Sequence, residues 1–542
     1  MEVRLVVASR QRAREDLSWT IEACSREYPD RIAIVDAEQE IQRTYAEFEE
    51  NSCRMANLLW SLGVRPGNNF GLLMQNSTEF LEVLFGAAKI GATAVLVNRR
   101  LTAAEMAYEL EDSASVGLIY SSRFDDSVAE LRSLLTTSRW WCRSGKEPAK
   151  SQTSSDYDLK SLAAEASARF EPLADVELAE AGWVIIYTSG TTGKPKGVVL
   201  TQSGVVAANN LCKRFLWARY GTALLPVVRS LVTAGMNHIG GLCTSSAPVL
   251  ADGGTLIVLD EFDPRKTLRA IEKYRVNLAF SVGTMWNAVV EENLEDYDLT
   301  SLQVVGTCIS PHTDHQLRQL NEGLGAEVYY MFGQTETTTG LITTRHTSDL
   351  WERPGTVGRP YGCINVRIVS AAGELVPVGE VGELQYRGPT LFSEYYGRPE
   401  ETKNAFEDGW FKSGDLVRAD ADGYLYFVDR LKDMVKTGGL NVFTIEVERV
   451  LAQHPDVQDA AVAGIPDRKW GEAVTAFVVP AAGATPDAGA LIAYCKQHLA
   501  HYKVPKRVEF VPEIPVNSLG KKLKRKLVSA LLAPTETADA GT

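Results

Sequence analysis

The chain is 542 residues long and 45% hydrophobic. A chain of this length is too long for one ordinary hydrophobic core, so we expect at least two domains. The formal net charge is −13 at pH 7, and a chain this acidic repels phosphate backbones, which argues against general nucleic-acid binding. The 8 cysteines form no CxxC pair and no cluster with metal-ligand spacing, so we expect free thiols in a reducing compartment.

The amino terminus carries charged side chains early, among them Arg4, Arg10 and Asp16, and no apolar stretch with a small-residue cleavage site follows. We therefore expect no signal peptide. No run of about 18 apolar residues occurs along the sequence, so we expect no membrane span. These features predict a cytoplasmic protein.

The first three-quarters of the chain alternates apolar runs with segments of helical periodicity. Residues 143–165 are polar, and we expect a surface connection there with too few apolar side chains to pack. The strand-like run 255–259 leads to Asp263, which we expect to cap a helix over 264–274 with Pro264 at its first position. An apolar run at 276–282 follows, and this strand–helix–strand order predicts parallel sheets covered by helices.

The next unit repeats this order, with expected strands at 302–305 and 327–331 and a helix near 314–320. The character of the chain changes near residues 430–433. Beyond it lie shorter elements, which we expect to form a separate small α+β domain: a turn at Gly438-Gly439, helices near 445–453 and 490–499, and strands at 458–462, 474–479 and 507–511. Residues 533–542 are small and polar, and we expect a disordered tail.

The strongest motif is the loop of residues 187–197, which lies between the strand-like runs 183–186 and 198–200. Its glycines let backbone N–H groups turn toward an anion, its hydroxyls donate hydrogen bonds, and Lys194 and Lys196 add positive charge. A Walker A loop needs Ser or Thr where Pro195 stands, so a P-loop kinase or GTPase is disfavoured. We expect a polyphosphate to be held by Thr188, Ser189, Gly190, Thr191, Thr192, Lys194 and Lys196.

This loop resembles the signature of the adenylate-forming superfamily, which includes acyl- and aryl-CoA synthetases, peptide-synthetase adenylation domains and firefly luciferase. The resemblance runs from the Thr44 segment to Lys526. It implies an α/β fold: a large N-terminal domain of helix-covered β-sheets at residues 1–430, a hinge at 431–433 and a small mobile α+β domain at 434–532. It also implies an acyl-CoA ligase that uses ATP and Mg²⁺ to form acyl-AMP and pyrophosphate, and then CoA to form the thioester.

By the same resemblance, several residues border the acyl group. His238 lies in a segment beside the acyl pocket, and Cys308 and Ile309 stand where relatives usually have glycines. These larger side chains predict a narrowed tunnel, whereas Gly283, in place of a common proline, opens space elsewhere. We therefore expect a compact or cyclic apolar acid. The resemblance places Ser310 and Pro311 beside the nucleotide and Gly333 in the pocket wall.

Residues 329–336 resemble the segment that binds adenine, phosphate and metal. The resemblance implies nucleotide contacts for Tyr329, Tyr330, Met331 and Phe332, with Tyr330 or Phe332 stacking on the base. It further implies that Thr335 hydrogen-bonds the α-phosphate. Glu336 supplies a hard oxygen ligand for Mg²⁺, which neutralises charge on the triphosphate.

Downstream, Asp415 resembles the residue whose carboxylate accepts hydrogen bonds from both ribose hydroxyls. Phe427 and Arg430 lie in a Gly/Tyr stretch that also reads as a hairpin, with Arg430 a second ribose or phosphate contact. Lys432 occupies the hinge position.

The last two family motifs are expected to serve CoA and adenylation. The resemblance places Gly438 and Gly439 in the loop of the pantetheine tunnel. Lys521 matches the adenylation lysine, which offsets repulsion between the substrate carboxylate and the α-phosphate. Because Lys521 belongs to the small domain and the phosphate loop to the large one, we expect catalysis to require domain closure.

Besides a luciferase-type oxygenase, which is disfavoured, two main alternatives remain open from the sequence. The enzyme could stop at acyl-AMP and pass it to a partner enzyme or carrier protein, or the chain could be a non-catalytic binding relative. The resemblance also disfavours an amino-acid substrate, because relatives that activate amino acids carry an aspartate just after the histidine segment and residues 236–250 contain no acid. The expected partner is a small carboxylic acid, and a homodimer is a further expectation.

Overall fold

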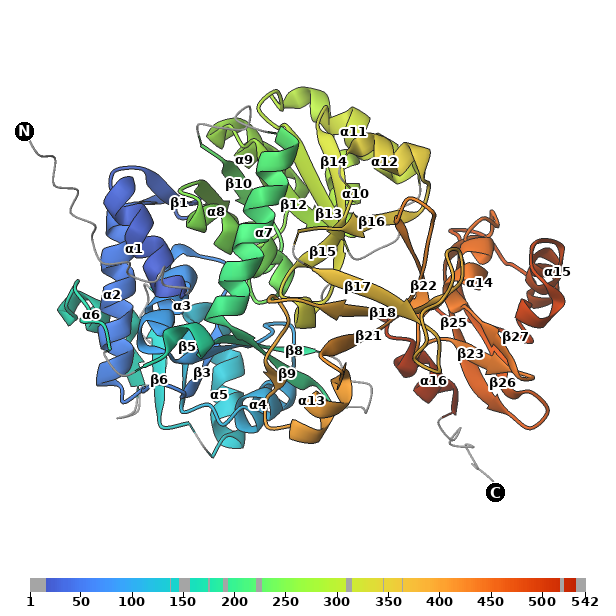
Figure 1. Cartoon of the computed structure of the whole chain (residues 1–542), viewed down its shortest axis with the longest axis horizontal. Helices are drawn as coiled ribbons and strands as arrows, with labels where there is room; N and C mark the ends of the chain where they lie inside the picture. Colours follow the sequence, from blue (N-terminus) through green and yellow to red (C-terminus); the bar gives the residue numbers. More distant parts are fainter. Residues whose placement is uncertain are drawn as a thin grey trace, which may run out of the picture. The chain divides into compact units, whose positions relative to one another are not determined.

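The computed structural model describes residues 16–136, 138–145, 156–173, 176–188, 194–220, 227–308, 314–344, 346–362, 364–516 and 521–532. The chain divides into two compact units, Met1–Asn365 with Arg387–Phe411, and Val366–Tyr386 with Lys412–Thr542 (Figure 1). Among the described residues, every helix is too short or too polar to cross a membrane.

The first unit is an α/β body built on two sheets. Its helices are α1 (Leu17–Glu27), α2 (Tyr45–Ser61), α3 (Thr78–Ile90), α4 (Ala103–Asp112), α5 (Asp125–Leu134), α6 (Leu159–Glu165), α7 (Gln202–Tyr220), α8 (Ala247–Ala251), α9 (Pro264–Tyr274), α10 (Gly283–Val290), α11 (Asp314–Leu324), α12 (Thr347–Glu352) and α13 (Pro399–Ala405). Its strands are β1 (Ile32–Asp36), β2 (Ile41–Thr44), β3 (Asn69–Leu73), β4 (Thr93–Leu96), β5 (Gly117–Ser121), β6 (Trp140–Ser144), β7 (Asp156–Asp158), β8 (Gly182–Thr188), β9 (Lys196–Thr201), β10 (Arg229–Val232), β11 (Thr255–Val258), β12 (Leu278–Val282), β13 (Val304–Cys308), β14 (Glu327–Gly333), β15 (Gly340–Thr343), β16 (Thr356–Pro360), β19 (Glu394–Tyr395) and β20 (Phe406–Glu407).

One sheet of this unit has the order β19-β9-β8-β4-β3-β5-β6-β7, and it is parallel from β8 to β7. The other runs β16-β15-β14-β13-β12-β10-β11-β1-β2 and is parallel from β14 to β1. Strands such as β3, β5 and β12 are buried along their whole length, as expected where helices cover both faces of a parallel sheet. The predicted helix-covered parallel sheets are therefore confirmed.

Local sequence explains the elements that were predicted best. Asp263 caps α9, because its side chain accepts a hydrogen bond from the Lys266 N–H, and Pro264 begins the helix as expected. Arg275 then ends the helix in the left-handed region, at φ 51°. The chain runs from β11 through α9 to β12, and both strands pair parallel with β10. This segment is therefore a helical crossover between parallel strands.

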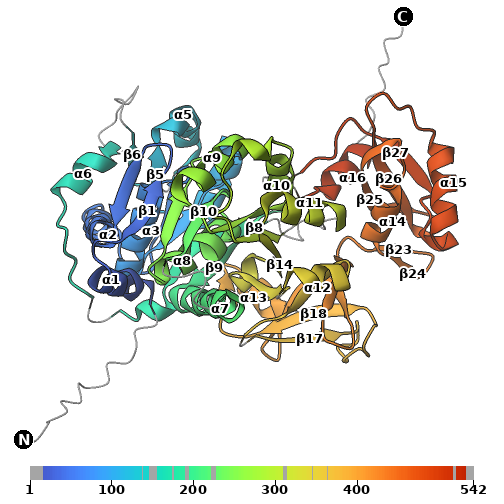
Figure 2. The ribbon, with the colours of Figure 1, turned by 90° about the horizontal axis from the view of Figure 1, so that it is seen from above.

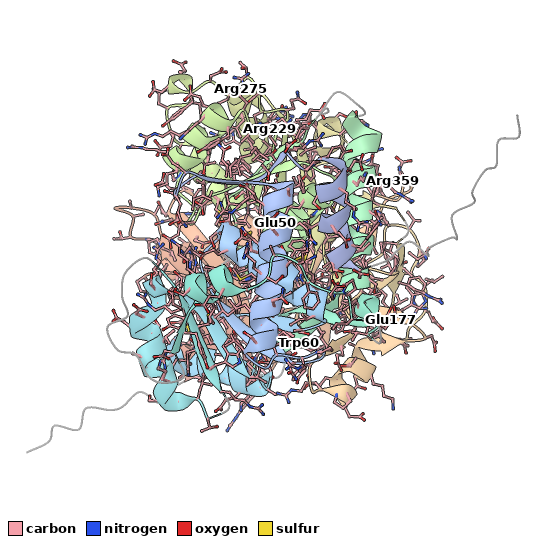
Figure 3. All side chains as sticks on the ribbon, turned by 90° about the vertical axis from the view of Figure 1, so that its left-hand side faces the viewer. Glu50, Trp60, Glu177, Arg229, Arg275 and Arg359 are labelled. Carbon is pink, nitrogen blue, oxygen red and sulfur yellow. The ribbon has the colours of Figure 1, made fainter. Side chains whose placement is uncertain are left out.

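Helices α2 and α3 pack closely in the first unit. Buried side chains recur on α2 at helical spacing, and its Phe48 lies edge-on to Phe85 of α3, with ring centroids 5.4 Å apart. A Cβ on Gly86 would lie 2.6 Å from the Cβ of Met55, so glycine permits the close approach. Figure 3 shows Glu50 and Trp60 on the other side of α2, the side turned toward the viewer.

The described part of the second unit contains four neighbouring strands, a separate five-stranded sheet and three helices (Figure 2). The neighbouring strands are β17 (Asn365–Val369), β18 (Gly382–Arg387), β21 (Trp410–Ala419) and β22 (Leu425–Arg430). The separate sheet comprises β23 (Val435–Thr437), β24 (Leu440–Val442), β25 (Val457–Asp467), β26 (Gly471–Pro480) and β27 (Arg507–Phe510). Apolar side chains of α14 (Thr444–Leu451) and α15 (Ala488–His498) cover one face of the β25–β26 pair, and α16 (Lys524–Leu532) packs on other side chains of the same strands. The α+β elements predicted beyond residue 433 are present, and the Gly423–Arg430 stretch forms a hairpin with β21.

One sequence prediction is wrong in part. Within residues 143–165, the expected surface connection includes the end of β6, the strand β7 and the helix α6, and Leu159 is buried. Backbone pairing extends the sheet here despite the polar sequence, and Asp125 neutralises Arg143 through an ion pair at 2.8 Å. The predicted domain boundary at residue 430 lies inside the second compact unit, and the division into 1–430, 431–433 and 434–532 stays a prediction.

Candidate active site

The phosphate loop joins the two strands of a hairpin in the first unit. Strands β8 and β9 pair antiparallel, with Thr188 opposite Lys196 at the end of the ladder. Residues 189–193 lie outside the described residues, and with them the predicted contacts Ser189, Gly190, Thr191 and Thr192. Lys194 is exposed, with its ammonium 5.4 Å from the ring centroid of Tyr108.

The lysine at the exit of this loop and the predicted metal ligand contact the same tyrosine. The Lys196 ammonium lies 4.9 Å from the ring centroid of Tyr395, and the Tyr395 hydroxyl donates to Glu336 Oε1 at 3.0 Å. Burial and the Glu336 charge raise the pKa of Tyr395, so its hydroxyl stays protonated and keeps donating. The sequence reasoning missed Tyr395, which lies far along the chain from both partners.

Glu336 follows β14 in a 3₁₀ turn at Thr335–Thr337, at the carboxyl end of the strand. A Cβ on Gly333 would lie 2.6 Å from the Thr339 carbonyl oxygen, so the turn requires glycine there. The backbone carbonyl of Glu336 accepts from the Phe392 N–H at 2.9 Å, which holds the turn against the segment that carries Tyr395. Glu336 is 8% exposed, and Thr335 is half-buried beside it.

No group of three or more metal-ligating side chains occurs in the described part of the chain. Mg²⁺ needs no such cage, because it keeps several waters and binds through one or two carboxylates together with phosphate oxygens. A single buried carboxylate, that of Glu336, therefore fits this metal when it arrives with a triphosphate.

The side chains of β14 divide between two faces, since strand residues alternate. Tyr329 and Met331 share one face, and the Tyr329 ring packs against Phe215 with centroids 5.2 Å apart. Tyr330 and Phe332, the predicted adenine partners, share the other face, and Phe332 is the more exposed of the two.

The predicted pocket residues meet at one edge of the parallel sheet. Val282 at the end of β12 pairs with Cys308, and Cys308 pairs with Met331 of β14. Gly283 follows β12 directly, so it lies at the same edge. The predicted residues Ile309, Ser310 and Pro311 lie outside the described residues.

A small apolar pocket, with room for about one water molecule, lies beside Met331. Cys212 Sγ lies 3.7 Å from Thr339 Oγ1, which in turn lies 3.1 Å from Thr244 in the π-helical segment that follows His238. Sequence reasoning found only Met331 among the lining residues, because apolar side chains from separate elements carry no chemical signature. The pocket is lined by Leu211, Cys212, Phe215, Met331, Gly340, Leu341, Thr343 and Tyr361.

His238 is half-buried, and its pKa is lowered to about 4 by burial and by the charges of Arg100 and Arg99. It is therefore neutral at pH 7 and can donate or accept one hydrogen bond without adding charge. Asn76, which the sequence reasoning missed, holds this segment by accepting from the Met236 N–H at 2.8 Å and donating to the Ala234 carbonyl at 3.0 Å.

A buried carboxylate–guanidinium pair lies in the second unit. Asp415 on β21 is fully buried, and Arg430 faces it from β22 with Nε 2.7 Å from Oδ1. This contact lacks hydrogen-bond geometry, and no other described donor reaches either carboxylate oxygen. Buried acceptors of this kind call for external donors, and a pair of ribose hydroxyls fits that requirement. Phe427 lies on the same strand as Arg430, opposite Val417.

Lys521 lies beside this pair in the same unit. Burial lowers the pKa of Lys521 to about 8, and the nearby charges of Arg430 and Lys432 act in the same direction, whereas Asp415 acts against them. Burial also lowers the pKa of Lys432. The structure thus brings four predicted residues together: Asp415, Arg430, Lys432 and Lys521.

The predicted CoA loop is a tight turn between β23 and β24, with Gly438 at φ 56° and Gly439 at φ 79°. Its Gly438 N–H donates to the Trp470 carbonyl at 2.8 Å, and the Trp470 ring lies 4.7 Å from the Lys469 ammonium and 5.5 Å from that of Lys506. The sequence reasoning missed Trp470, although an aromatic residue among cations is a readable signal. The turn therefore ends beside an aromatic, positively charged surface that suits an anionic nucleotide.

The chain matches the model of the AMP-binding enzyme family over residues 21–396 and that of the AMP-binding enzyme C-terminal domain over residues 446–521. It is 37% identical to a feruloyl-CoA synthase of Amycolatopsis sp, over 89% of this chain and 92% of that protein. It is 33% identical to the long-chain-fatty-acid–CoA ligase FadD13 of Mycobacterium tuberculosis, over 95% and 98%.

Among solved structures, the anthranilate CoA ligase AuaEII in complex with anthranoyl-AMP superposes with a TM-score of 0.83 at 25% identity, covering 95% of this chain and 97% of that one. The family resemblance inferred from the motifs is confirmed. The chain therefore belongs to the AMP-binding enzyme family and is an ATP-dependent, AMP-forming carboxylate–CoA ligase that uses ATP, Mg²⁺ and coenzyme A to convert an organic acid to its thioester.

Proposed function

We propose that the acid is compact, cyclic and uncharged apart from its carboxylate. The observation that carries this proposal is the edge of the sheet predicted to border the acyl group, where Gly283 and Cys308 are both uncharged. A charged substituent buried there would lack a counterion, which costs several kcal/mol, roughly, per ion.

The side chains near this edge support a ring rather than a long chain. Phe215 packs against both Tyr329 and Tyr361, with ring centroids 5.2 and 5.3 Å apart, so one wall is a fixed aromatic surface. Cys308 adds volume at the edge of the sheet next to Met331. Of the relatives, the feruloyl-CoA synthase and the anthranilate CoA ligase are named for aromatic acids, and this substrate class fits an aromatic wall better than a fatty chain does.

Within the first unit, we assign phosphate and metal binding to residues around the β8–β9 loop. Lys196, with the hydroxyls and glycines of the loop, holds the β- and γ-phosphates, and Glu336 holds Mg²⁺, which neutralises charge on the triphosphate. Thr335 contacts the α-phosphate. Tyr395 keeps the Glu336 carboxylate in place by donating a hydrogen bond to it.

Within the second unit, the Asp415 carboxylate accepts hydrogen bonds from the ribose hydroxyls, and its ion pair with Arg430 holds Asp415 in place. A carboxylate is a poor acyl donor, and its attack on the α-phosphate is opposed by repulsion between two anions. We assign Lys521 the role of offsetting that repulsion with its ammonium group. Gly438 and Gly439 then line the path of the CoA thiol, and Lys432 serves as the hinge.

A panel of acids tests the substrate class. The purified chain is supplied with ATP, Mg²⁺ and CoA, and thioester formation is measured for ferulate, benzoate and palmitate, each with a control that lacks CoA. We expect kcat/KM for a ring acid to exceed that for palmitate by about tenfold or more, since each misplaced methylene costs a hydrophobic pocket about 1–3 kcal/mol. Equal use of palmitate and every ring acid would exclude the proposal.

The role of Lys521 has a separate test. Lys521→Ala should abolish exchange of pyrophosphate into ATP yet still make thioester from supplied acyl-AMP, because only the first step needs the ammonium. Normal exchange by this variant would remove Lys521 from the mechanism.

Compartment and assembly stay at the level of proposals. The described cysteines are all free, which supports the predicted cytoplasmic location. The homodimer and the carrier-protein acceptor stay predictions, and sedimentation equilibrium of the purified chain tests the first.

A further inference from the structure

The phosphate-loop lysine already has an anionic partner within the first unit. Lys196 forms a short ion pair with Glu401 on α13, and its side chain is only 14% exposed. The ring of Tyr395 lies beneath the same ammonium, 4.9 Å away. Lys196 is therefore held in one position by a carboxylate and an aromatic face rather than extended into solvent.

Glu401 lies between two cations that differ in their own anchoring. Its Oε1 is 3.9 Å from Arg398 Nε, and Arg398 is fixed in turn by Asp112 at 2.5 Å. Asp112 also accepts from the Tyr187 hydroxyl at 2.9 Å, at the entrance to the phosphate loop. Arg398 is thus anchored by a second carboxylate, that of Asp112, whereas Lys196 makes its ion pair with Glu401.

The Glu401 carboxylate is held in place by its ion pairs with Lys196 and Arg398. Its Oε2, the oxygen that contacts Lys196, is buried, and no donor in the described part of the chain makes a hydrogen bond to it. Among the described residues, these ion pairs hold the carboxylate, so a more highly charged anion can displace it from Lys196 while Arg398 offers an alternative partner.

We propose that Glu401 is an internal counterion of Lys196. In the nucleotide-free enzyme Glu401 pairs with the Lys196 ammonium, and when ATP binds the triphosphate replaces Glu401 there. The inference rests on the phosphate-binding role proposed above for Lys196. On displacement, Glu401 turns to Arg398, so its charge stays paired. When pyrophosphate leaves, Glu401 takes Lys196 back.

This exchange has two consequences that a purely structural ion pair does not have. Competition by Glu401 weakens the binding of ATP and of pyrophosphate alike, because both need Lys196. It also speeds the departure of pyrophosphate, since the returning carboxylate replaces the leaving anion at the lysine. Removal of the Glu401 charge should therefore tighten both ligands and slow product release.

The experiment measures binding of Mg·ATP and of Mg·pyrophosphate to the full chain by titration calorimetry without acid or CoA. The variants are Glu401→Gln, which keeps the shape and removes the charge, and Glu400→Gln, a neighbouring exposed acid as the matched control. Lys196→Met and the double variant Lys196→Met/Glu401→Gln complete a cycle. Thermal unfolding midpoints confirm that each variant is folded.

We expect Glu401→Gln to bind both ligands about fivefold more tightly, the scale of a partly exposed ion pair, while Glu400→Gln stays at the wild-type value. In the Lys196→Met background the same change should have no effect. Unchanged or weaker binding by Glu401→Gln, or an equal gain in Glu400→Gln, overturns the counterion role alone. If Lys196→Met binds ATP normally, the phosphate-binding role of Lys196 is wrong as well, and the two failures are thus distinguished.

Discussion

Replacing Lys521 by methionine should stabilise the folded enzyme while removing adenylation. The ammonium of Lys521 is taken from water into a half-buried position beside Arg430 and Lys432, and its pKa falls from 10.5 to about 8. A lowered lysine pKa means that the charged form is disfavoured in the folded state. Asp415 keeps Arg430 as its charge partner when Lys521 is removed.

The size and sign of the effect follow from linkage. The fall from 10.5 to about 8 corresponds to about 3 kcal/mol of cost for carrying the charge in the folded state. Between about pH 8 and pH 10.5 the unfolded chain keeps a proton on Lys521 that the folded chain has lost, so the free energy of unfolding rises with pH there. The cost is therefore fully present at pH 7, where Lys521→Met should raise the free energy of unfolding by up to about 3 kcal/mol.

Urea unfolding at pH 7 and at pH 10 measures this difference, and Lys522→Met is the matched control. Lys522 makes an ion pair with Asp459 at 2.6 Å, so its loss should destabilise the protein slightly or leave it unchanged. The gain in Lys521→Met should shrink as the pH rises. If Lys521→Met is less stable than the wild type at pH 7, the burial argument is wrong.

Activity should follow the same titration. In the wild type, kcat/KM for ATP in pyrophosphate exchange should fall as the pH rises through about 8, since the free enzyme then loses the ammonium. The fall in kcat should come at higher pH, because bound triphosphate favours the charged form. Lys521→Arg should lack this fall, as arginine stays protonated. An unchanged alkaline fall in the arginine variant would show that another group titrates.

Three other predictions address the pocket, a buried acid and the second unit. Gly340→Ala places a Cβ 2.8 Å from that of Met331, which pairs with Cys308 at the predicted acyl edge. Met331 must then shift, so kcat/KM for the bulkiest ring acid should fall by about tenfold in the acid panel and by less for benzoate. Burial raises the pKa of Glu109 from 4.5 to about 8, so between these values the folded state holds a proton that the unfolded state has lost. Stability therefore falls as the pH rises toward 8. Glu109→Gln should remove this contribution to the fall in melting temperature. Thr444→Val removes a hydroxyl that donates to the buried Asp429 carboxylate at 2.9 Å, and urea unfolding of the full chain should show a loss of about 1–2 kcal/mol.

Chain-local physics explains what the sequence predicted well. The cap at Asp263 and the proline after it define the start of α9, and continuous apolar runs mark the buried parallel strands. Motifs whose chemistry depends on residue type, such as Glu336 and Lys521, could be found because their neighbours in the chain carry the family pattern. The polar stretch at 143–165 was misjudged because backbone pairing, which extends the sheet there, leaves little trace in side-chain polarity.

The sequence by itself thus determined the class of fold, the reaction and the order of the motifs, since these depend on periodicity and on residue types that stand together in the chain. Only the tertiary structure decided which distant side chains meet. Tyr395 between Lys196 and Glu336, Glu401 against Lys196, and Trp470 beside the Gly438 turn are separated along the chain by tens to hundreds of residues. Such contacts depend on how sheets and loops pack, and packing is a property of the whole fold, so no local pattern in the sequence could have predicted them.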